Sequence, residues 1–385
     1  MAATLDSPAG LLPRLQRDAA ECVGRYARDV DRAARFPEEA IDWLKSEGLL
    51  GANVPAAMGG LGLDLETTSA IARTLAQYCS STAMTFAMHC IQVACLVNHG
   101  GRGYLEDFLR ETARGQLLIA SVTSEVGVGG EMRRSIAAVE RHDDACFVAK
   151  QASTISYGRY ADAYLLTARR SPDSEPSDQS LVLISRDQAT LERTGEWDAL
   201  GMRGTCSEAF KLEASFGPEA ILPDAFGAIA EQTMVPVSHV LWASCWLGIA
   251  QEAFRRARDY TRAAAAKSDP AEFVLGRLAE MTSALQSASL TLKAVIEWYG
   301  NQPPGAEQTL ADSIRINNLK LTVSELAQKV VADALAVTGM AGYSEASPFS
   351  VARLLRDVTS SGLMIGNDRI KRTNGAALLA VRNLF

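Results

Sequence analysis

The sequence predicts an α+β fold made of three consecutive blocks: an N-terminal helical domain over residues 1–118, a middle β domain over 119–225 and a C-terminal four-helix bundle over 226–385. Helix start and stop signals punctuate the first block, short β-type runs alternate with polar turns in the second, and apolar residues step by three and four in the third. A chain of 385 residues is long enough to give such domains sizeable cores.

The first block carries the signals that begin and end helices. A proline and two acids at 37–39 are typical of a helix start, and Gly48 is placed to end that helix. The Gly-rich turn 59–62 then precedes a second helix, which carries the apolar positions of residues 71–78. We therefore expect a set of helices joined by tight turns.

The middle block changes period and predicts a small β domain. Its β-type runs are residues 147–148, 164–167, 181–184 and 210–213. In the last of these, apolar and charged residues alternate, as they do on a strand with one buried face. The polar segment 171–178 is predicted to be an exposed hairpin loop.

The third block returns to a helical period. Its clearest stripe consists of apolar residues three and four positions apart, which is typical of a bundle helix: Leu278, Met281, Leu285, Ala288, Leu292 and Val295.

Composition excludes several classes of function. Lysine and arginine total 38 against 45 acids, and the net charge of −7 is spread along the chain, so neither a nucleic-acid stripe nor a polybasic membrane anchor is expected. The sequence contains no continuous apolar run of about 18 residues and no N-terminal secretory signal pattern, so we expect a cytoplasmic protein that does not span a membrane.

Neither cysteine nor histidine spacing indicates a metal or disulfide site. The seven cysteines are scattered without a C-x-x-C pair, which favours buried free thiols. The four histidines form no ligand pair at helical spacing, so no metal is expected.

Near the C-terminus, residues 338–343 form a Gly-rich turn that is followed by Pro348 and by the Arg356-Asp357 pair. This run resembles the acyl-CoA dehydrogenase superfamily, in which it joins the last two helices. The order of helical, β and helical blocks matches that family over nearly the whole chain. The resemblance implies an FAD cofactor and a substrate tethered to CoA or to a carrier protein.

Two further segments resemble the flavin-binding parts of that family. Residues 123–131 match a loop that lines the flavin and thioester cavity, with valine at 126, glycine at 130 and glutamate at 131 where the family has proline, serine and aspartate. Residues 153–156 fall where the family has a strand with a tryptophan lid and a hydroxyl for the flavin ring; Thr154 replaces the tryptophan and Ser156 keeps the hydroxyl. In the turn 200–207, which also resembles the family, Arg203 is expected to be structural or near the cavity rim.

A third flavin-binding segment of the family departs further from the pattern. The loop expected after Tyr260 lacks the residues that grip the adenosine diphosphate of a neighbouring subunit's FAD, and leaves Arg262 or Lys267 to meet the pyrophosphate. This change suggests either a looser grip on FAD or a disordered surface loop with FAD held elsewhere. The residues that the resemblance implies for FAD contact are Thr123, Glu125, Gly127, Gly129, Gly130, Thr154, Ser156, Arg262, Gly339, Gly366 and Asn367.

The proton acceptors of the family are both replaced. In one branch a glutamate directly before the helix-opening glycine removes the α-proton of an acyl thioester, and here that position is Ile365, which cannot accept a proton. The backbone N–H at this position binds the thioester carbonyl in the family, and a backbone donor survives the replacement. In another branch the base lies on the first bundle helix, where counting back ten positions from Gly248 gives Ser238, followed by His239.

His239 permits two interpretations. It is either a substitute base, since imidazole titrates near neutral pH, or a helix histidine satisfied by a core carbonyl or a neighbouring subunit. Loss of a general base typically costs about 10²–10⁴ in rate.

These replacements leave three hypotheses for function. The first is a flavin-dependent monooxygenase or oxygenase acting on an acyl thioester or a related small substrate in specialised metabolism, supplied by a flavin reductase. The second is an α,β-dehydrogenase with a non-standard base, His239 or Glu131 among the candidates, passing electrons to an electron-transfer flavoprotein. The third is a catalytically silent assembly subunit. FAD sites shared between subunits in the family imply a homodimer or homotetramer.

Overall fold

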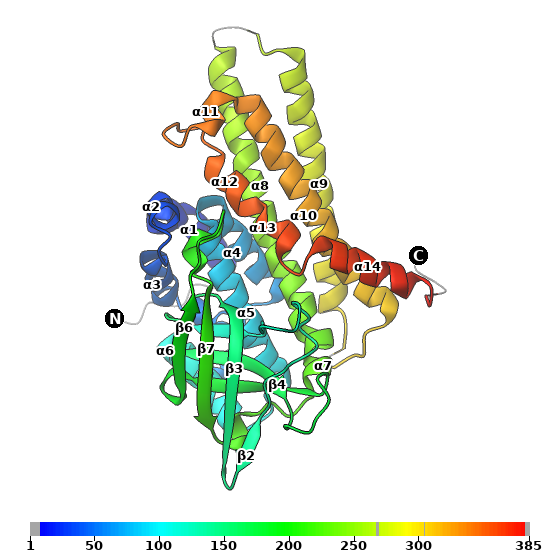
Figure 1. Cartoon of the computed structure of the whole chain (residues 1–385). Helices are drawn as coiled ribbons and strands as arrows, with labels where there is room; N and C mark the ends of the chain where they lie inside the picture. Colours follow the sequence, from blue (N-terminus) through cyan, green and yellow to red (C-terminus); the bar gives the residue numbers. More distant parts are fainter. Residues whose placement is uncertain (1–7, 267–268, 304, 382–385) are drawn as a thin grey trace.

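The structure is a computed structural model that describes residues 8–266, 269–303 and 305–381 (Figure 1). Its first part is helical, as predicted, and its helices are α1 (Pro8–Ala19), α2 (Ala27–Ala33), α3 (Glu38–Ser46), α4 (Leu65–Tyr78), α5 (Ser80–His99) and α6 (Tyr104–Gly115). α3 begins directly after Pro37, and Gly48 beyond its end adopts a left-handed φ of 75°. The helix start and stop predicted there are confirmed.

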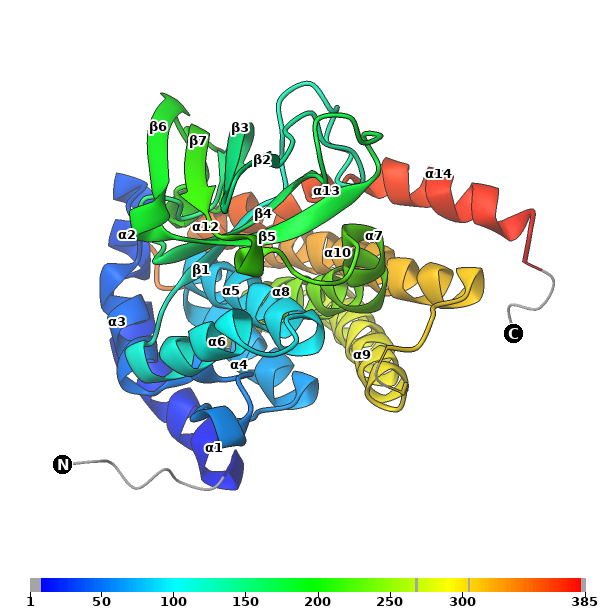
Figure 2. The same ribbon diagram turned by 90° about the horizontal axis from the view of Figure 1, so that it is seen from below.

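Two sheets make up the middle part, and both lie on one side of the helices (Figure 2). The strands are β1 (Ile119–Val122), β2 (Glu140–His142), β3 (Ala145–Ile155), β4 (Ala163–Arg169), β5 (Gln179–Ser185), β6 (Ala189–Gly195) and β7 (Glu208–Phe216). One sheet has the order β1-β4-β5 and the other β2-β3-β7-β6. The predicted runs lie on β3, β4, β5 and β7, and segment 171–178 is the hairpin loop between β4 and β5.

The last part of the chain is helical (Figure 1), and its helices include long and short ones. They are α7 (Phe226–Ile229), α8 (Val235–Ala265), α9 (Glu272–Gly300), α10 (Leu310–Thr338), α11 (Met340–Tyr343), α12 (Ala352–Val358), α13 (Ser360–Leu363) and α14 (Asn367–Leu378). α8 is the central helix, since most of its first half is buried between α4, α5 and α10. The stripe predicted from residue 278 lies on α9.

One local prediction is wrong. The segment after Tyr260 was expected to be a loop, but α8 continues to Ala265. The alanines at 263–265 explain this, because alanine has the highest helix propensity of any residue.

The β part is fixed to the C-terminal helices at the turn before β7. The Asp357 carboxylate of α12 accepts a hydrogen bond from the Met202 amide at 2.7 Å. A Cβ atom on Gly201 would lie 2.2 Å from the Arg356 carbonyl oxygen, so only glycine allows this approach. Arg356 itself pairs with Asp31 of α2 and with Glu345. The three parts of the chain therefore meet at one charged junction.

Two helices, Ser80–His99 and Phe226–Ala265, are long and apolar enough to cross a membrane, but 83% and 89% of their apolar windows are buried inside the protein. Buried core helices pass the same test of length and composition, so these helices give only weak support for a membrane span. All seven cysteines are free thiols and six of them are buried, as predicted.

Candidate active site

The Gly-rich loop of the β part meets the start of α14. Arg369 on the first turn of α14 donates hydrogen bonds to the carbonyl oxygens of Gly129, at 2.6 Å, and Gly130. Both glycines have left-handed φ angles, 63° and 73°, which a side chain would disfavour. The predicted positions 129–130 and 366–367, more than two hundred residues apart, thus lie at the same place.

The end of β3 lies beside the same loop. The Ser124 hydroxyl donates to the Thr154 carbonyl at 2.6 Å and accepts from the Thr154 amide at 3.1 Å. The register between β3 and β7 shifts between Ala152 and Ile155, which leaves Thr154 exposed and without a partner on β7. Its hydroxyl donates to the Ser124 hydroxyl at 3.3 Å, so the exposed oxygen is available to a ligand as an acceptor.

Ser156 lies just past this bulge and is half-buried. Its hydroxyl is 2.8 Å from the Ser207 hydroxyl, which in turn is 2.8 Å from the hydroxyl of Thr205. A chain of hydroxyls can reorient to offer either a donor or an acceptor at its end.

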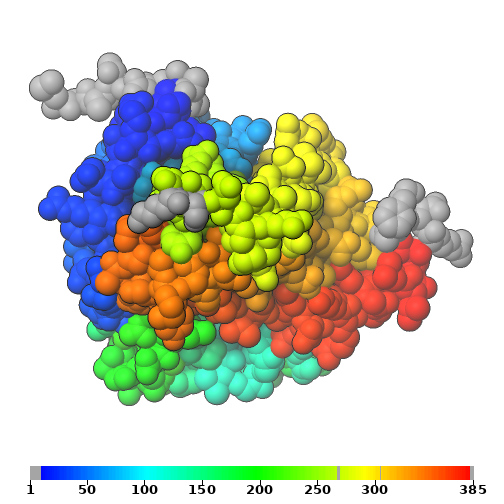
Figure 3. All heavy atoms as spheres, turned by 90° about the horizontal axis from the view of Figure 1, so that it is seen from above, coloured from blue at the N-terminus to red at the C-terminus, as the bar shows by residue number. Residues whose placement is uncertain are grey.

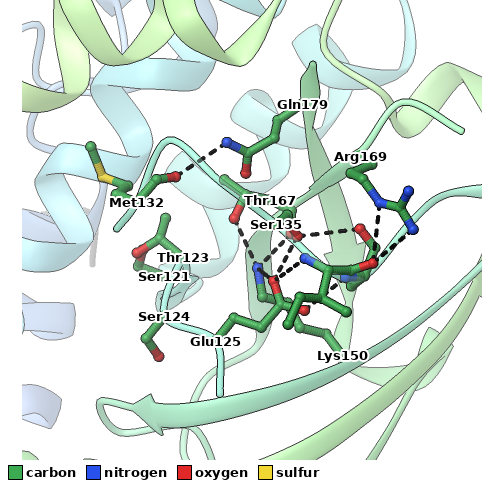
Figure 4. A network of polar contacts seen from close by, with 12 residues as sticks. Ser121, Thr123, Ser124, Glu125, Met132, Ser135, Lys150, Thr167, Arg169 and Gln179 are labelled. Carbon is green, nitrogen blue, oxygen red and sulfur yellow. Dashed lines mark hydrogen bonds and ion pairs between the residues drawn. The ribbon is translucent and has the colours of Figure 1, made fainter. Parts of the chain in front are cut away.

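Glu125 lies in a network of polar contacts (Figure 4). Its carboxylate is buried and accepts hydrogen bonds from the Ser135 hydroxyl at 2.7 Å and from the amides of Ile136 and Ala137 at 3.1 and 2.7 Å. The Lys150 ammonium lies 3.5 Å away and also donates to Thr167. The carboxylate is therefore committed inside the β part, and contact of Glu125 with the cofactor stays a prediction.

Lys150 is a buried cation that this carboxylate only partly compensates. Burial lowers the pKa of Lys150 to about 8, although Glu125 acts in the opposite direction. The pair fixes the start of the Gly-rich loop to β3 and β4, so the position of the loop depends on it.

Ile365 occupies the turn between α13 and α14. Its φ is 49°, a left-handed value that costs a β-branched residue about 1–3 kcal/mol, and its side chain is 36% exposed. Among the described residues, no hydrogen-bond partner is recorded for its backbone N–H. The turn thus offers an apolar side chain and a free backbone donor.

Lys320 of α10 lies under this turn and is completely buried. Its ammonium donates to the Ser361 carbonyl at 2.8 Å and to the Asn367 side-chain oxygen at 2.5 Å, and lies 5.5 Å from the centre of the Trp246 ring. Burial lowers the pKa of Lys320 to about 8. Sequence reasoning missed this residue; the one signal was a lysine between the apolar residues 319 and 321 of a bundle helix.

His239 of α8 is buried beside Lys320. Its Nδ1–H donates to the Ile316 carbonyl of α10 at 3.2 Å, and Nε2 has no partner in the described part of the chain. Burial lowers the pKa of His239 to about 4, so the imidazole is neutral at pH 7. This contact with a core carbonyl agrees with the structural interpretation of His239, while the unpartnered Nε2 leaves the substitute-base interpretation open. The neighbouring Ser238 is also buried.

The remaining predicted contacts lie elsewhere. Gly339 follows the C-terminal end of α10, about 28 Å along the helix axis from Lys320 at 1.5 Å per residue. Figure 3 looks onto this end of the bundle, where the ends of α8 and α9 lie beside the segment that follows α10. Arg262 is exposed on the last turn of α8, and Lys267 lies outside the described residues. The structure does not bring Gly339 or Arg262 to the Ile365 turn of the same chain.

Within the described ranges, no group of three or more histidine, cysteine, aspartate or glutamate side chains is arranged to hold a metal ion. None of the ion pairs or hydrogen bonds recorded for Lys320, His239 and Asn367 involves a carboxylate.

Comparison with known protein families gives matches at both ends of the chain. Residues 13–116 match the acyl-CoA dehydrogenase N-terminal domain, and residues 228–379 match the acyl-CoA dehydrogenase C-terminal domain.

Similar proteins include enzymes with different names. The chain is 28% identical to L-evernosamine nitrososynthase of a Micromonospora species, over 94% of this chain and 85% of the relative. It is 25% identical to cyclohex-1-ene-1-carbonyl-CoA dehydrogenase of Syntrophus aciditrophicus, over 96% and 89%. Among solved structures, FMN-bound TdsC of Paenibacillus sp. A11-2 is similar with a TM-score of 0.82 and 20% identity, over 98% and 97% of the two chains.

Proposed function

The chain belongs to the acyl-CoA dehydrogenase superfamily, and from this premise we propose that it is a flavin-dependent oxygenase acting on an acyl thioester or a related small molecule. The observation that carries the proposal is Ile365. At the position where one branch of the family holds a glutamate base, this chain has an apolar side chain next to a free backbone N–H.

The described residues fit the ring of a flavin. Three positions of the loop, Gly127, Gly129 and Gly130, carry no side chain, and the exposed Thr154 and half-buried Thr123 offer hydroxyls next to it. A bound flavin would supply two-electron redox chemistry and reaction with O₂. Arg262, which the resemblance implies for the pyrophosphate of FAD, is exposed on the last turn of α8.

The residues of this chain would bind and shield rather than exchange protons at the turn. The Ile365 N–H would donate to a carbonyl oxygen of the substrate, and the isoleucine side chain would exclude water from the reacting atoms. Similarity to a nitrososynthase, whose name describes formation of an N–O bond, supports oxygen transfer as the reaction class.

The proposal is tested by oxygen consumption. The purified protein is supplied with FAD, a flavin reductase and NADH, and is offered butyryl-CoA, benzoyl-CoA and a dTDP-amino sugar in turn. We expect one class of substrate to accelerate O₂ uptake and to yield an oxygenated product, with catalase present to remove peroxide from uncoupled turnover. Equal uptake with and without every substrate would contradict the proposal.

A second candidate function, α,β-dehydrogenation, is favoured by the unpartnered Nε2 of His239. Its Nδ1–H is held by a backbone carbonyl, which orients Nε2 as a proton acceptor. Anaerobic bleaching of bound FAD by butyryl-CoA, lost in His239→Ala, would support this candidate. The lowered pKa of His239, about 4, makes it a weak base and places this function second.

Retention of flavin distinguishes the silent-subunit hypothesis from the two enzyme hypotheses. An absorption spectrum after gel filtration with added FAD would show a bound flavin for either enzyme. A colourless protein in the presence of excess FAD would favour the silent subunit.

A further inference from the structure

Lys320 is held in an unusual way for a buried cation. It is completely buried in the middle of α10, and none of the recorded ion pairs in the described chain includes it. Its acceptors are one backbone carbonyl, Ser361, and one amide side chain, Asn367. A buried charge without a carboxylate partner is costly, so this position calls for a reason other than packing.

The two acceptors bracket the Ile365 turn. Ser361 lies on α13, four residues before Ile365, and Asn367 opens α14, two residues after it. A single ammonium group therefore holds both sides of the turn at the same time.

Two further polar residues of α10 hold the same two partners. Ser324 accepts a hydrogen bond from the Asn367 side-chain nitrogen at 3.0 Å, and Gln328 donates to the Ser361 hydroxyl at 2.9 Å. Positions 320, 324 and 328 are four residues apart and so lie on one face of the helix. We call Lys320, Ser324 and Gln328 the α10 strip.

The turn needs such support. A left-handed φ at a β-branched residue persists only when its surroundings determine it, and the side chain of Ile365 is too exposed to be fixed by packing alone. Without the α10 strip, the direction of the Ile365 N–H would not be fixed.

We propose that Lys320 is a positioning residue, which clamps the Ile365 turn from both sides and thereby aims its backbone N–H at the substrate. The second half of this statement rests on the proposed function, and the first half does not. Lys320 would contact neither substrate nor flavin, because its ammonium binds the Ser361 carbonyl and the Asn367 side chain and lies against the Trp246 ring.

The test is hydrogen exchange of the backbone amides, read by mass spectrometry on the full chain without flavin or substrate. In Lys320→Met, peptides covering residues 362–367 are expected to exchange at least tenfold faster, while peptides from α9 exchange as before. Lys293→Met, which removes an exposed lysine of α9, serves as the matched control and is expected to change neither. Unchanged exchange at 362–367, or equally faster exchange throughout the bundle, would overturn the proposal.

Asn367→Asp provides a second variant for the case that Lys320→Met fails to fold. It keeps the shape of the side chain and places a carboxylate against the ammonium. The hydrogen bond to Ser324 is lost, but the bond from Lys320 becomes an ion pair, so the clamp is retained. Protection at residues 362–367 is expected to be equal to or higher than in the wild type. A loss of protection in Asn367→Asp would contradict the clamp.

The pH profile gives a readout that a merely structural lysine would not share. The pKa of Lys320 is raised by Glu325 on α10, and Lys320 in turn lowers the pKa of His239 on α8. Lys371 of α14 pairs with Glu325 at 2.7 Å. As Lys320 loses its proton above pH 8, its hydrogen bonds lose their charge. Exchange at 362–367, corrected for intrinsic base catalysis, is expected to rise above pH 8 in the wild type, at higher pH in Asn367→Asp, and not in Lys320→Met.

A flat corrected profile in the wild type would contradict the proposal. Because exchange is measured without flavin, failure of the oxygenase assay leaves this result intact. Conversely, the protein could be an active oxygenase and still keep residues 362–367 protected in Lys320→Met. That result would contradict the positioning role of Lys320 and leave the proposed function intact.

Discussion

Replacing Glu125 with glutamine is expected to destabilise the protein by an amount that depends on pH in a defined way. The substitution keeps the shape of the side chain but removes the charge next to the buried Lys150 ammonium. It also turns an NH₂ group towards a site whose three hydrogen-bonding neighbours include two backbone N–H groups. Two separate costs follow.

The first cost is one unsatisfied buried donor, about 1–3 kcal/mol. The second cost is limited by the pKa of Lys150, which is about 8 in the native protein. Without Glu125, Lys150 releases its proton. Because pH 7 lies one unit below the native pKa, the free energy lost with that proton is at most about 1.4 kcal/mol. The substitution is therefore expected to lower the free energy of unfolding by about 2–4 kcal/mol at pH 7. The contribution of Lys150 disappears at pH 9, because this lysine is already neutral in the native protein there.

The assay is urea denaturation of the wild type and Glu125→Gln at pH 7 and pH 9. Repeating both measurements in a Lys150→Met background should remove the pH dependence, since no buried ammonium remains. Glu213→Gln, which breaks an exposed pair with Lys211, is the control and should cost less than about 1 kcal/mol. A destabilisation by Glu125→Gln that grows from pH 7 to pH 9 would show that Glu125 does not stabilise the Lys150 ammonium.

Two further predictions concern His239 and Gly201. The native pKa of His239 is about 4, below the unfolded value, so its contribution to stability is complete above pH 6.5 and is lost as the pH falls towards 4. Between pH 7 and pH 5, the free energy of unfolding of His239→Gln should therefore fall by about 2 kcal/mol less than that of the wild type, measured by urea denaturation. Gly201→Ala should lower the melting temperature by several degrees because its Cβ would lie 2.2 Å from the Arg356 carbonyl, whereas Gly227→Ala in α7, which meets nothing within 4 Å, should not. Equal acid sensitivity of wild type and His239→Gln, or equal melting of the two alanine variants, would contradict these predictions.

The elements that could be predicted from the sequence have an unambiguous period or a local stop signal. The alternation on β7 and the stripe on α9 are periodic, and α3 has a proline before it and a glycine after it. β6 could not be predicted, because this edge strand buries little and its residues 189–195 include a single large apolar side chain, Leu191.

The candidate site was harder to predict because its contacts join distant segments. The loop 123–131 and the start of α14 were both recognised, but only the fold shows that Arg369 links them. The pairing of Glu125 with Lys150 could not be predicted, because Lys150 lies on a strand and no local pattern links it to the loop that carries Glu125. Lys320 was missed because a lone lysine on a helix is normally exposed. The signal available was its place between the apolar residues 319 and 321.

Oxygen transfer without a carboxylate base at position 365 is tested with isotopically labelled O₂. The protein is incubated under labelled O₂ with FAD, a flavin reductase, NADH and the substrate that accelerates oxygen uptake. The mass of the product is then measured by mass spectrometry. For a flavin-dependent oxygenase, the product is expected to carry the label. An unlabelled α,β-unsaturated product, formed equally well without O₂ when an electron acceptor is supplied, would contradict it.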